Sequence, residues 1–224
     1  MGPQGSGKGT QAELIAKKFD LFHFDSGSYL RSVLYDPASK NDKIIQRERK
    51  LNEAGALNTP SWILKIFSQI VKKTAILKKG IVLSGSPRSL YEAFGYNQGE
   101  NPKNKTGLMD VLSKSYGKEN VFTFVLDIPL KESLKRTSGR LTCSVCKSPF
   151  MIQKYKIDSC PFCGGEIIKR KDDNKESIIK RLDEYKNRTT PILIELKKRK
   201  YKIFKIDGTP VPYKIHKTIF SKVN

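Results

Sequence analysis

The first ten residues, MGPQGSGKGT, contain a glycine-rich loop suited to holding phosphate groups. The glycines let the backbone curl so that successive N–H groups point at phosphate oxygens, and the following helix adds its N-terminal dipole. Lys8 can reach the outer phosphates and the Thr10 hydroxyl a magnesium ion. In the general pattern Ser or Thr follows the lysine directly, whereas Gly9 intervenes here. We predict a phosphate-binding loop of unusual spacing; a merely flexible N-terminus is the alternative.

Four cysteines form a second group that could do chemistry. They lie in CSVC at 143–146 and CPFC at 160–163, with thirteen residues between the two pairs. Each short loop can present two thiolates to one tetrahedral Zn²⁺, so we predict that Cys143, Cys146, Cys160 and Cys163 hold a structural zinc. Two disulfides are disfavoured in a reducing cytosol, and thioredoxin-like redox pairs lack their fold context. Both remain as alternatives.

The composition indicates a soluble globular protein with a basic surface. Lys and Arg number 43 against 22 Asp and Glu, which gives a formal net charge of +21. Apolar runs such as VFTFVL are of strand length and too short to cross a membrane, and no secretory signal leads the sequence. We therefore expect a cytoplasmic monomer with no membrane partner. Basic charge attracts nucleic acids and polyphosphates alike, but we interpret it as ordinary solvated surface, without a dedicated nucleic-acid partner.

Alternating strand and helix patterns surround these motifs and predict an α/β fold with a mainly parallel sheet. Residues 97–118 are polar and broken by Gly and Pro, so we predict a surface insertion there. Residues 141–169 carry the cysteines and few helix formers, which predicts a separate small lobe. Strands are expected within 21–27, 81–88, 120–129 and 201–208, and helices within 8–19, 28–35, 41–56, 60–80, 131–140, 175–199 and from about Pro212.

The order of the motifs resembles that of the adenylate kinase family. GPQGSGKGTQ is similar to the family's phosphate loop, SGSYLR to its TGDxLR, and LSGSPRSLYEA to its LDGFPRTxxQA. RKDDN and KRLDEY resemble the stretch that closes the lid. The match covers nearly the whole chain, apart from residues 97–118 and the start. It implies reversible transfer of the γ-phosphoryl group of magnesium-bound ATP to AMP, which gives two ADP.

The resemblance also implies a three-part organisation. We expect a three-layer phosphate-loop core at 1–25, 58–140 and 172–224, in which helices flank a parallel sheet. A small helical lobe at 26–57 would bind the nucleoside monophosphate, and a zinc-ribbon-like lid would occupy 141–171.

Site residues follow from the same resemblance. Phosphoryl transfer depends on fixed positive donors around the migrating group, and the planar fork of arginine suits this task. The implied catalytic residues are Lys8, Arg88, Arg140, Arg170 and Arg181. The implied ATP site comprises Gly5, Ser6, Gly7, Lys8, Gly9, Thr10, Arg136, Arg140, Pro149, Phe150 and Pro210. The implied AMP site comprises Ser26, Arg31, Leu57, Asn58, Gly85, Arg88, Glu92, Arg170 and Arg181.

Several substitutions depart from the family pattern. Ser28 and Ser84 replace two aspartates that organise water around magnesium, which should loosen the ion; Thr10, Asp172 and Asp173 remain as oxygen donors, the last two through water or lid contacts. Ser86 replaces a phenylalanine of the family, which removes packing beneath Arg88.

Glu92 stands where the family has glutamine. An ionised carboxylate only accepts hydrogen bonds, so it suits a base edge with two donors, as in guanine, unless it is protonated. We favour AMP as the acceptor. Another nucleoside monophosphate kinase, with GMP, UMP or CMP as acceptor, and a degenerate nucleotide- or RNA-binding protein without activity are the alternatives.

Only Met1 precedes the loop, where the family has a central apolar strand. Either translation begins upstream of the recorded start, which we favour, or the sheet has lost this strand. Loss of a central strand predicts unpaired backbone groups on both neighbours and a long void in the core.

Overall fold

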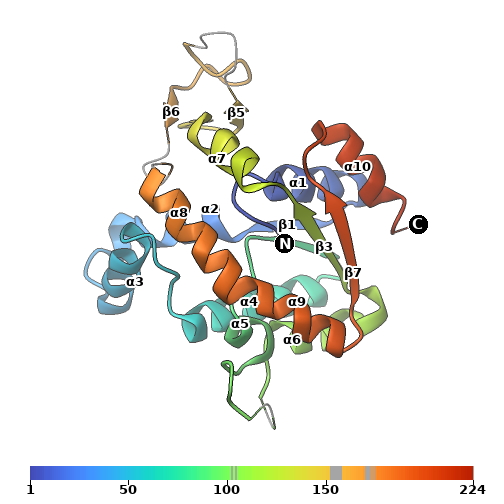
Figure 1. Ribbon diagram of the computed structural model, residues 1–224. Helices are drawn as coiled ribbons and strands as arrows, with labels where there is room; N and C mark the ends of the chain where they lie inside the picture. The colour runs from blue at the N-terminus through green and yellow to red at the C-terminus, as the bar shows by residue number, and fades with distance from the viewer. Residues whose placement is uncertain (102, 104, 152–157, 170–172, 174, 224) are drawn as a thin grey trace.

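Four parallel strands in two pairs form the centre of the molecule (Figure 1). The computed structural model describes residues 1–101, 103, 105–151, 158–169, 173 and 175–223. Strand β1 (Phe22–Asp25) pairs with β2 (Ile81–Ser84), and β3 (Phe122–Asp127) pairs with β7 (Lys202–Asp207). The predicted α/β class with parallel strands is confirmed.

Helices cover both faces of the two strand pairs. On one face α1 (Lys8–Phe19) packs against β1, β2 and α10 (Pro212–Phe220). On the other face α4 (Pro60–Ile76) packs against α5 (Leu90–Phe94) and α6 (Leu108–Tyr116), and α9 (Thr190–Lys198) packs against β7. The buried positions of α4, Ile63, Phe67, Val71 and Thr74, recur every three or four residues, which places them on one helix face.

Residues 175–199, expected as helix, form an uninterrupted helical run of α8 (Lys175–Glu184), a π-helical turn (Tyr185–Thr189) and α9. The π-helical turn was not expected. Pro191 lies in the first turn of α9, where its missing N–H costs no regular helical bond.

Residues 97–118, expected as a surface insertion, contribute α6 to the core, where Leu108 and Met109 are buried. Gly107 lets α6 approach α5, because a Cβ there would lie 2.2 Å from the Phe94 nitrogen. Polar residues on both sides of α6 made its apolar helix face hard to recognise in the sequence.

Two smaller units project from the strand pairs. Helices α2 (Ser26–Leu34) and α3 (Lys43–Glu53) pack on each other and are joined through a short 3₁₀ turn (Pro37–Ser39). Helix α7 (Leu130–Ser138) leads to an antiparallel sheet in the order β5 (Pro149–Met151), β4 (Arg140–Cys143), β6 (Ile167–Lys169). A further 3₁₀ turn, Lys118–Asn120, precedes β3. Figure 1 shows α3 and the β4–β6 sheet at separate edges of the molecule.

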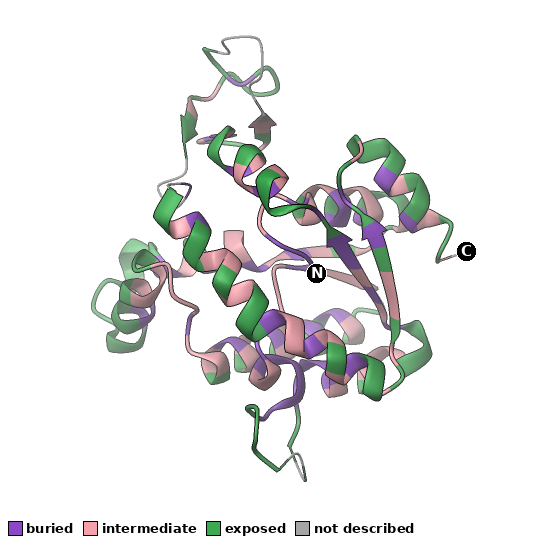
Figure 2. Ribbon diagram, viewed as in Figure 1, coloured by how far each residue is buried: buried purple, intermediate pink, exposed green. Residues whose placement is uncertain are grey.

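Among the described residues, no strand joins β2 to β3, as the prediction of a missing central strand requires. Met1 lies at one end of this gap, where its C=O accepts a hydrogen bond from Leu126 N at 2.8 Å and its ammonium donates to the Phe124 C=O. Figure 2 shows the N-terminus reaching the inner side of β3, where buried positions gather. The sheet is thus divided at its centre.

Within the described part of the chain, we find no helix with the length and apolar character needed to span a lipid bilayer.

Candidate active site

The glycine-rich loop adopts the backbone that its sequence predicts. Gly5 and Gly7 have φ values of 78° and 86°, in the left-handed region that glycine occupies without strain. A Cβ on Gly5 would lie 2.9 Å from the Thr137 hydroxyl, so this glycine also permits close approach to α7. At Gly7 and Gly9 a Cβ would meet nothing within 4 Å. The loop therefore presents open backbone at the N-terminus of α1, which is the arrangement that binds phosphate.

Lys8 lies inside this loop and points back across it. Its Nζ donates to Pro3 O at 2.6 Å and lies 3.5 Å from Ser6 Oγ. Burial, together with the positive charges of Arg88 and Arg140, lowers the pKa of Lys8 to about 7. A polyphosphate among these three cations would favour the protonated lysine.

Arg88 follows β2 and is fixed by its own backbone. The Arg88 N–H donates to Glu92 Oε2 at 2.7 Å, and its C=O accepts from Thr189 Oγ1 at 2.9 Å. Its pKa lies below the usual value because the side chain is buried and the charges of Arg181 and Arg31 repel it, although Glu92 and Asp25 act in the opposite sense. Arg31, Arg88 and Arg181 line the same cavity, which makes this region attractive to an anion.

Arg140 is held at the start of β4 by a buried carboxylate. Asp173, which is 1% exposed, accepts Arg140 Nε at 2.9 Å and a second guanidinium nitrogen at 2.6 Å, and Gln4 Nε2 at 3.2 Å. Asp173 thus links the glycine-rich loop to the cysteine-bearing unit. The fork-to-fork geometry fixes the plane of the guanidinium. Asp173 was expected to act as an oxygen donor near magnesium through water or lid contacts, and that role stays a prediction.

Arg136 joins α7 to the turn that follows β7. Its Nε donates to Glu132 Oε1 at 2.6 Å, and its two terminal nitrogens donate to Gly208 O at 2.8 Å and Thr209 O at 2.7 Å. Its donor edges are therefore committed to protein groups, which fixes the orientation of the guanidinium plane beside the loop.

The end of β1 carries a carboxylate that the sequence analysis overlooked. Asp25 accepts from Gly27 N at 3.0 Å and from Ser28 Oγ at 2.8 Å, and so caps α2. Ser28 Oγ in turn accepts from Arg31 at 3.0 Å. The sequence could have indicated Asp25, because it is an acidic residue at the carboxyl end of a predicted parallel strand and ligands bind outside these ends. Asp25 returns a negative charge near Ser28, where the family pattern has one.

Ser84 and Ser26 connect the ends of β1 and β2. Ser26 Oγ donates to Ser84 O at 3.0 Å, and Ser84 Oγ lies 2.9 Å from His23 Nε2. Burial lowers the pKa of His23, although Asp25 and Glu13 oppose this shift. The Ser84 hydroxyl thus contacts His23 at the position where the family has an aspartate.

A small pocket lies beside the main cavity at the foot of α2. Its wall consists of Leu30, Leu57, Asn58, Ile63, Ser86, Arg88 and Glu92. Glu92 is 2% exposed, and burial raises its pKa to about 7 despite the hydrogen bond from Arg88 N. The predicted base-contacting residues Leu57, Asn58 and Glu92 are therefore neighbours.

A second buried carboxylate, also missed by the sequence analysis, positions Asn58. Glu48 is fully buried and accepts from Thr59 N at 2.8 Å and Asn58 Nδ2 at 3.1 Å, while Arg47 donates to it at 2.9 Å. Burial would raise the pKa of Glu48, but these hydrogen bonds outweigh it and leave the pKa below its ordinary value. Its position on a helix of scattered charges gave no signal in the sequence.

We expect Glu48→Gln to lower the free energy of unfolding by about 3 kcal/mol, because an amide would turn a donor towards donors that now meet a carboxylate. Thermal unfolding should then begin about 8 °C lower. Since the pKa of Glu48 is depressed, its stabilisation is present above the unfolded-state pKa and lost as pH falls through the folded-state pKa. Arg47→Gln, at the exposed partner, should change stability far less; equal losses would contradict this account.

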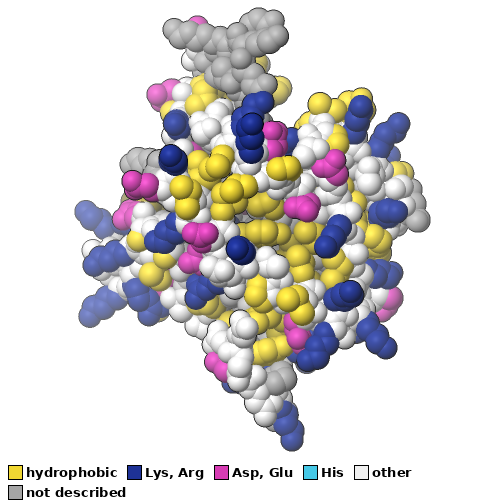
Figure 3. Space-filling view, viewed as in Figure 1, with side chains coloured by type: hydrophobic (Ala, Val, Ile, Leu, Met, Phe, Trp, Pro, Cys, Tyr) yellow, Lys and Arg dark blue, Asp and Glu magenta, His cyan; other side chains and the backbone are white. Residues whose placement is uncertain are grey.

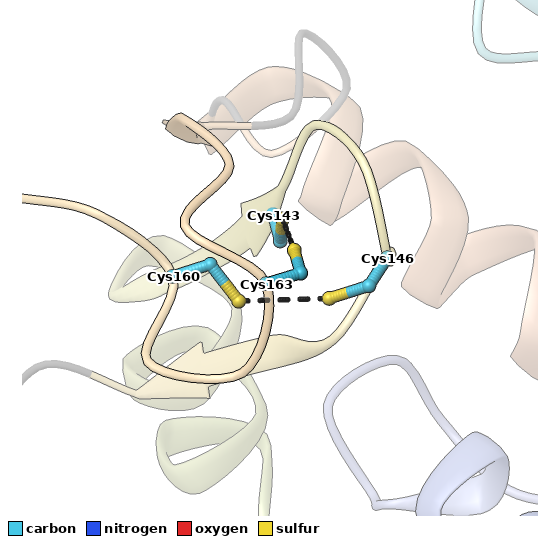
Figure 4. Close-up of side chains that lie close together, drawn as sticks. All are labelled: Cys143, Cys146, Cys160 and Cys163. Atoms are coloured by element: carbon cyan, nitrogen blue, oxygen red, sulfur yellow. Dashed lines mark hydrogen bonds between the residues drawn. The ribbon is translucent and has the colours of Figure 1, made fainter.

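The four cysteines lie together in the β4–β6 unit (Figure 4). Cys143 Sγ and Cys163 Sγ are 3.5 Å apart, as are Cys146 Sγ and Cys160 Sγ, and all four sulfurs lie within 4.8 Å of one another. These separations are far above the S–S bond length of a disulfide, about 2.05 Å. They are close to the edge of about 3.8 Å that four thiolates make around a tetrahedral zinc. The donor set therefore fits a zinc ion.

One continuous cavity collects most of the predicted site residues. Its wall includes Gly5, Gly7, Lys8, Gly9, Thr10, Arg31, Leu57, Asn58, Gly85, Arg88, Arg136, Arg140, Pro149 and Arg181. Other predicted residues lie off this wall. Ser6 and Ser26 are buried behind it, and the Phe150 ring stacks on Phe162 at 6.1 Å. Pro210 lies in the turn before α10. Arg170 and Asp172 lie outside the described residues.

A glycine-rich loop before a helix, facing clustered arginines at the ends of parallel strands, defines a nucleotide-binding α/β protein of the phosphate-loop class. The family model described as adenylate kinase matches residues 1–201. The chain therefore belongs to the adenylate kinase family.

Curated relatives cover the chain almost completely. The adenylate kinase of Dehalococcoides mccartyi strain 195 is 32% identical over 100% of this chain and 95% of its own length. The adenylate kinase of Clostridium tetani is 29% identical over 93% of this chain and 89% of its own length, and that of Syntrophomonas wolfei 30% over 86% and 83%.

Proposed function

We propose that this protein is an ATP:AMP phosphotransferase that converts ATP and AMP reversibly into two ADP. The observation that carries the proposal is the convergence of Lys8, Arg88, Arg140 and Arg181 on one cavity with the glycine-rich loop. A transferring phosphoryl group spreads negative charge over its oxygens, and fixed cations stabilise that charge without reorganising. Family membership points to the same reaction.

Each cation has a distinct task in this proposal. Lys8 and the loop N–H groups hold the β- and γ-phosphates of ATP, Arg88 and Arg31 hold the AMP phosphate, and Arg140 and Arg181 bridge the two. Arg170 is proposed to act with them from the implied lid sequence. The Asp173 carboxylate keeps Arg140 aimed at the loop. These positions bring donor and acceptor together in line, which supplies much of the rate enhancement.

Magnesium accompanies ATP in this proposal. Magnesium is usually held by one or two carboxylates, retained waters and the substrate phosphates. Thr10 and Asp25 line the cavity and supply a hydroxyl and a carboxylate of this kind. When bound, the ion neutralises charge on the β- and γ-phosphates. Ser28 and Ser84 offer hydroxyls in place of carboxylates, so weaker magnesium binding is expected.

Three parts are proposed to divide the work: a core at 1–25, 58–140 and 172–224, a monophosphate-binding lobe at 26–57 and a zinc lid at 141–171. The contact of Asp173 with Gln4 and Arg140 lies at the hinge of the proposed lid. Zinc would hold the two cysteine knuckles as one rigid body that excludes water on closing.

A coupled assay for ADP formation tests the function directly. ATP is offered with AMP, GMP, UMP or CMP, and the proposal expects AMP to give the highest kcat/KM. Preference for another acceptor would identify a different nucleoside monophosphate kinase. Salt-sensitive RNA binding without ADP formation would instead indicate a non-catalytic protein.

Glu92 is the observation that favours another acceptor. With a pKa raised to about 7, it is protonated in weak acid and ionised in weak base. Protonated, it can both donate and accept, as adenine N1 and N6 require; ionised, it only accepts. The preference for one acceptor base over another should therefore depend on pH.

We expect Glu92→Gln to raise kcat/KM for AMP about tenfold at pH 8.5 and to change it little at pH 6. The sign follows from the raised pKa: the parent loses its donor as pH rises through about 7, whereas an amide keeps it. The pH profile of kcat/KM for AMP and for GMP checks this. A variant whose profile still falls above pH 7 would show that another group causes the fall.

A further inference from the structure

Four turns, each of which joins a helix to a parallel strand, form the end of the molecule opposite the glycine-rich loop. Met1, directly before the loop, accepts a hydrogen bond from Leu126 N at 2.8 Å, near the carboxyl end of β3. The amino ends of parallel strands meet at the other edge of a sheet. In Figure 1 the tails of the β3 and β7 arrows mark this end, away from α7.

Contacts between the four turns make them one surface. Strands β1 and β2 are paired from their first residues, so the turns that precede them are adjacent. The Tyr116 hydroxyl donates to Lys79 O at 3.0 Å, which joins the turn before β3 to the turn before β2. Lys202 Nζ donates to Glu119 O at 2.6 Å, which adds the turn before β7. We term this surface the basic end; it comprises residues 17–22, 72–80, 114–122 and 197–202.

Positive charge is concentrated on the basic end. Its four segments contain thirteen Lys and Arg against Asp20 and Glu119, an excess of eleven out of the net +21 of the whole chain. All thirteen are exposed except Arg199, which is partly buried. In Figure 3, Lys and Arg side chains gather at the lower right, where Figure 1 shows the tail of β7. The basic surface is therefore uneven, with about half of its excess charge at one end.

Helix stability explains only part of this charge. Lysines in the last turns of α1, α4, α6 and α9 complement the negative ends of the helix dipoles. Five further exposed lysines lie beyond the ends of these helices: Lys78, Lys79, Lys118, Lys200 and Lys202. Repulsion among so many like charges opposes folding, so a role in binding an anionic partner is the better explanation.

Exposed apolar side chains lie among these lysines. Ile76 and Leu77, where α4 ends, are 79% and 74% exposed, and Phe22 at the start of β1 is 46% exposed. Two lysines precede the aliphatic pair and two follow it, in the stretch KKTAILKK. A surface that combines lysines with protruding apolar groups is complementary to anionic lipid headgroups above an acyl-chain layer.

We propose that the basic end docks on the surface of a membrane that contains anionic phospholipid, with its lysines at the headgroups and Ile76 and Leu77 inserted between them. Docking of this kind needs no helix that crosses the bilayer. The expectation of no membrane partner was based on the lack of long apolar runs, and this proposal revises it.

The residue types favour a lipid surface over RNA. Recognition of RNA relies on aromatic side chains that stack on bases and on the planar guanidinium of arginine. At the basic end twelve of the thirteen cations are lysines, which act as hydrated point charges and need no fixed partner geometry. The two most exposed apolar side chains there are aliphatic.

Docking at the basic end leaves the nucleotide cavity accessible. Lys8, Arg88 and Arg140 line that cavity at the carboxyl ends of the strands, whereas the basic end lies at their amino ends. The attached protein would therefore still exchange nucleotides with solution. The proposal concerns a second surface and does not depend on the proposed reaction.

The first test is co-sedimentation of the full-length protein with vesicles. One set is phosphatidylcholine alone, and the other contains about 30% phosphatidylserine. We expect at least about tenfold tighter binding to the anionic vesicles at about 50 mM salt, and most of this gain should disappear at about 500 mM salt because exposed charges are then screened. Equal binding to both sets of vesicles, or no binding to either, would overturn the proposal.

A pair of variants tests whether position or total charge matters. Each loses three exposed lysines: Lys72→Gln/Lys73→Gln/Lys78→Gln at the basic end and Lys40→Gln/Lys43→Gln/Lys50→Gln around α3. The first variant should bind anionic vesicles about tenfold or more weakly than the parent, and the second should lose less than about threefold. Thermal unfolding verifies that both variants fold. Equal losses would show that diffuse charge, and not the basic end, causes the binding.

The aliphatic pair has its own readout. Leu77→Trp places an indole at the proposed interface, and Ile44→Trp places one on α3, at a side chain that is 49% exposed. With anionic vesicles the emission of Leu77→Trp should shift to shorter wavelength, because the indole leaves water for the membrane interface. The emission of Ile44→Trp should not shift. Trp62, the one tryptophan of the parent, gives both variants the same background.

Two further outcomes would also overturn the proposal. Unchanged Leu77→Trp emission with vesicle-bound protein would mean that the pair does not enter the interface. Tighter binding to polyuridylate than to anionic vesicles, weakened by loss of the basic-end lysines, would identify a nucleic acid as the partner of this surface. All of these measurements are independent of ADP formation, so their failure and the failure of the proposed reaction are distinguishable.

Discussion

Lys8→Met is expected to reduce kcat for ADP formation by about 10³-fold or more, the range seen when one fixed donor to a transferring group is removed. Lys8 is the lysine of the glycine-rich loop, and its Nζ is held over that loop by Pro3 O. Methionine keeps the length and the apolar stem but loses the charge. Since the interaction strengthens as charge develops on the phosphoryl group, kcat should fall more than the KM for ATP rises.

The stability of the Lys8→Met variant separates a catalytic effect from a folding effect. The folded-state pKa of Lys8 is lowered, so burying its charge costs stability fully below about pH 7, and the cost disappears as pH rises to the unfolded-state value near 10.5. The variant should therefore unfold at the same or a higher temperature than the parent at pH 6.

Lys17→Met is the matched control. Lys17 lies on the same helix, with its side chain 74% exposed and paired to Glu13 at 2.8 Å. An exposed pair of this kind contributes little to stability, so activity and Tm should stay within error of the parent. Turnover retained by Lys8→Met, or lost equally by Lys17→Met, would contradict the assignment.

The sequence predicted those parts of the site that require particular residue types at fixed spacing. The glycine-rich loop, the arginine after β2 and the paired CxxC knuckles each need particular residues at fixed spacing, so their letters identify them. The structure brings Lys8, Arg88, Arg140 and Arg181 to one cavity and the four cysteines to one cluster. Their roles in phosphoryl transfer stay predictions until the variants are measured.

Other features depend on distant partners, and no local pattern reveals them. Asp173 accepts hydrogen bonds from Gln4 and Arg140, and Glu48 accepts them from Asn58 and Thr59. The role of each carboxylate depends on these partners. The segment that contains helix α6 was predicted to lie on the surface because polar turn residues surround it. The structure instead buries α6 against α4 and α5. The gap between β2 and β3 was predicted from the lack of residues ahead of the loop. The hydrogen bonds that Met1 makes to β3 were not.

The cysteine cluster carries the second large expected effect: the purified protein should contain about one zinc per chain, and Cys160→Ser should contain almost none. Structural zinc contributes roughly 10–16 kcal/mol of binding free energy in small folded units, and that energy is also folding energy. Among its described residues, the β4–β6 unit has short strands of three or four residues and few buried apolar side chains. Without the metal its backbone should open, because so small a unit lacks a sufficient core of its own.

Loss of the zinc is expected to lower kcat about 10²-fold, because Arg140 begins this unit and a displacement of about 1 Å can cost that much. Ser144→Ala is the matched control, since Ser144 lies between two of the cysteines and its backbone N–H, which donates to Glu166 O at 2.8 Å, is unchanged. Metal content by mass spectrometry, amide exchange of residues 140–149 and turnover form one experiment. The core should keep its Tm, because the β1–β2 and β3–β7 pairs form sheets separate from the β5–β4–β6 sheet. Protected amides at 140–149 in a metal-free Cys160→Ser chain would mean that the sheet, and not the ion, holds this unit together.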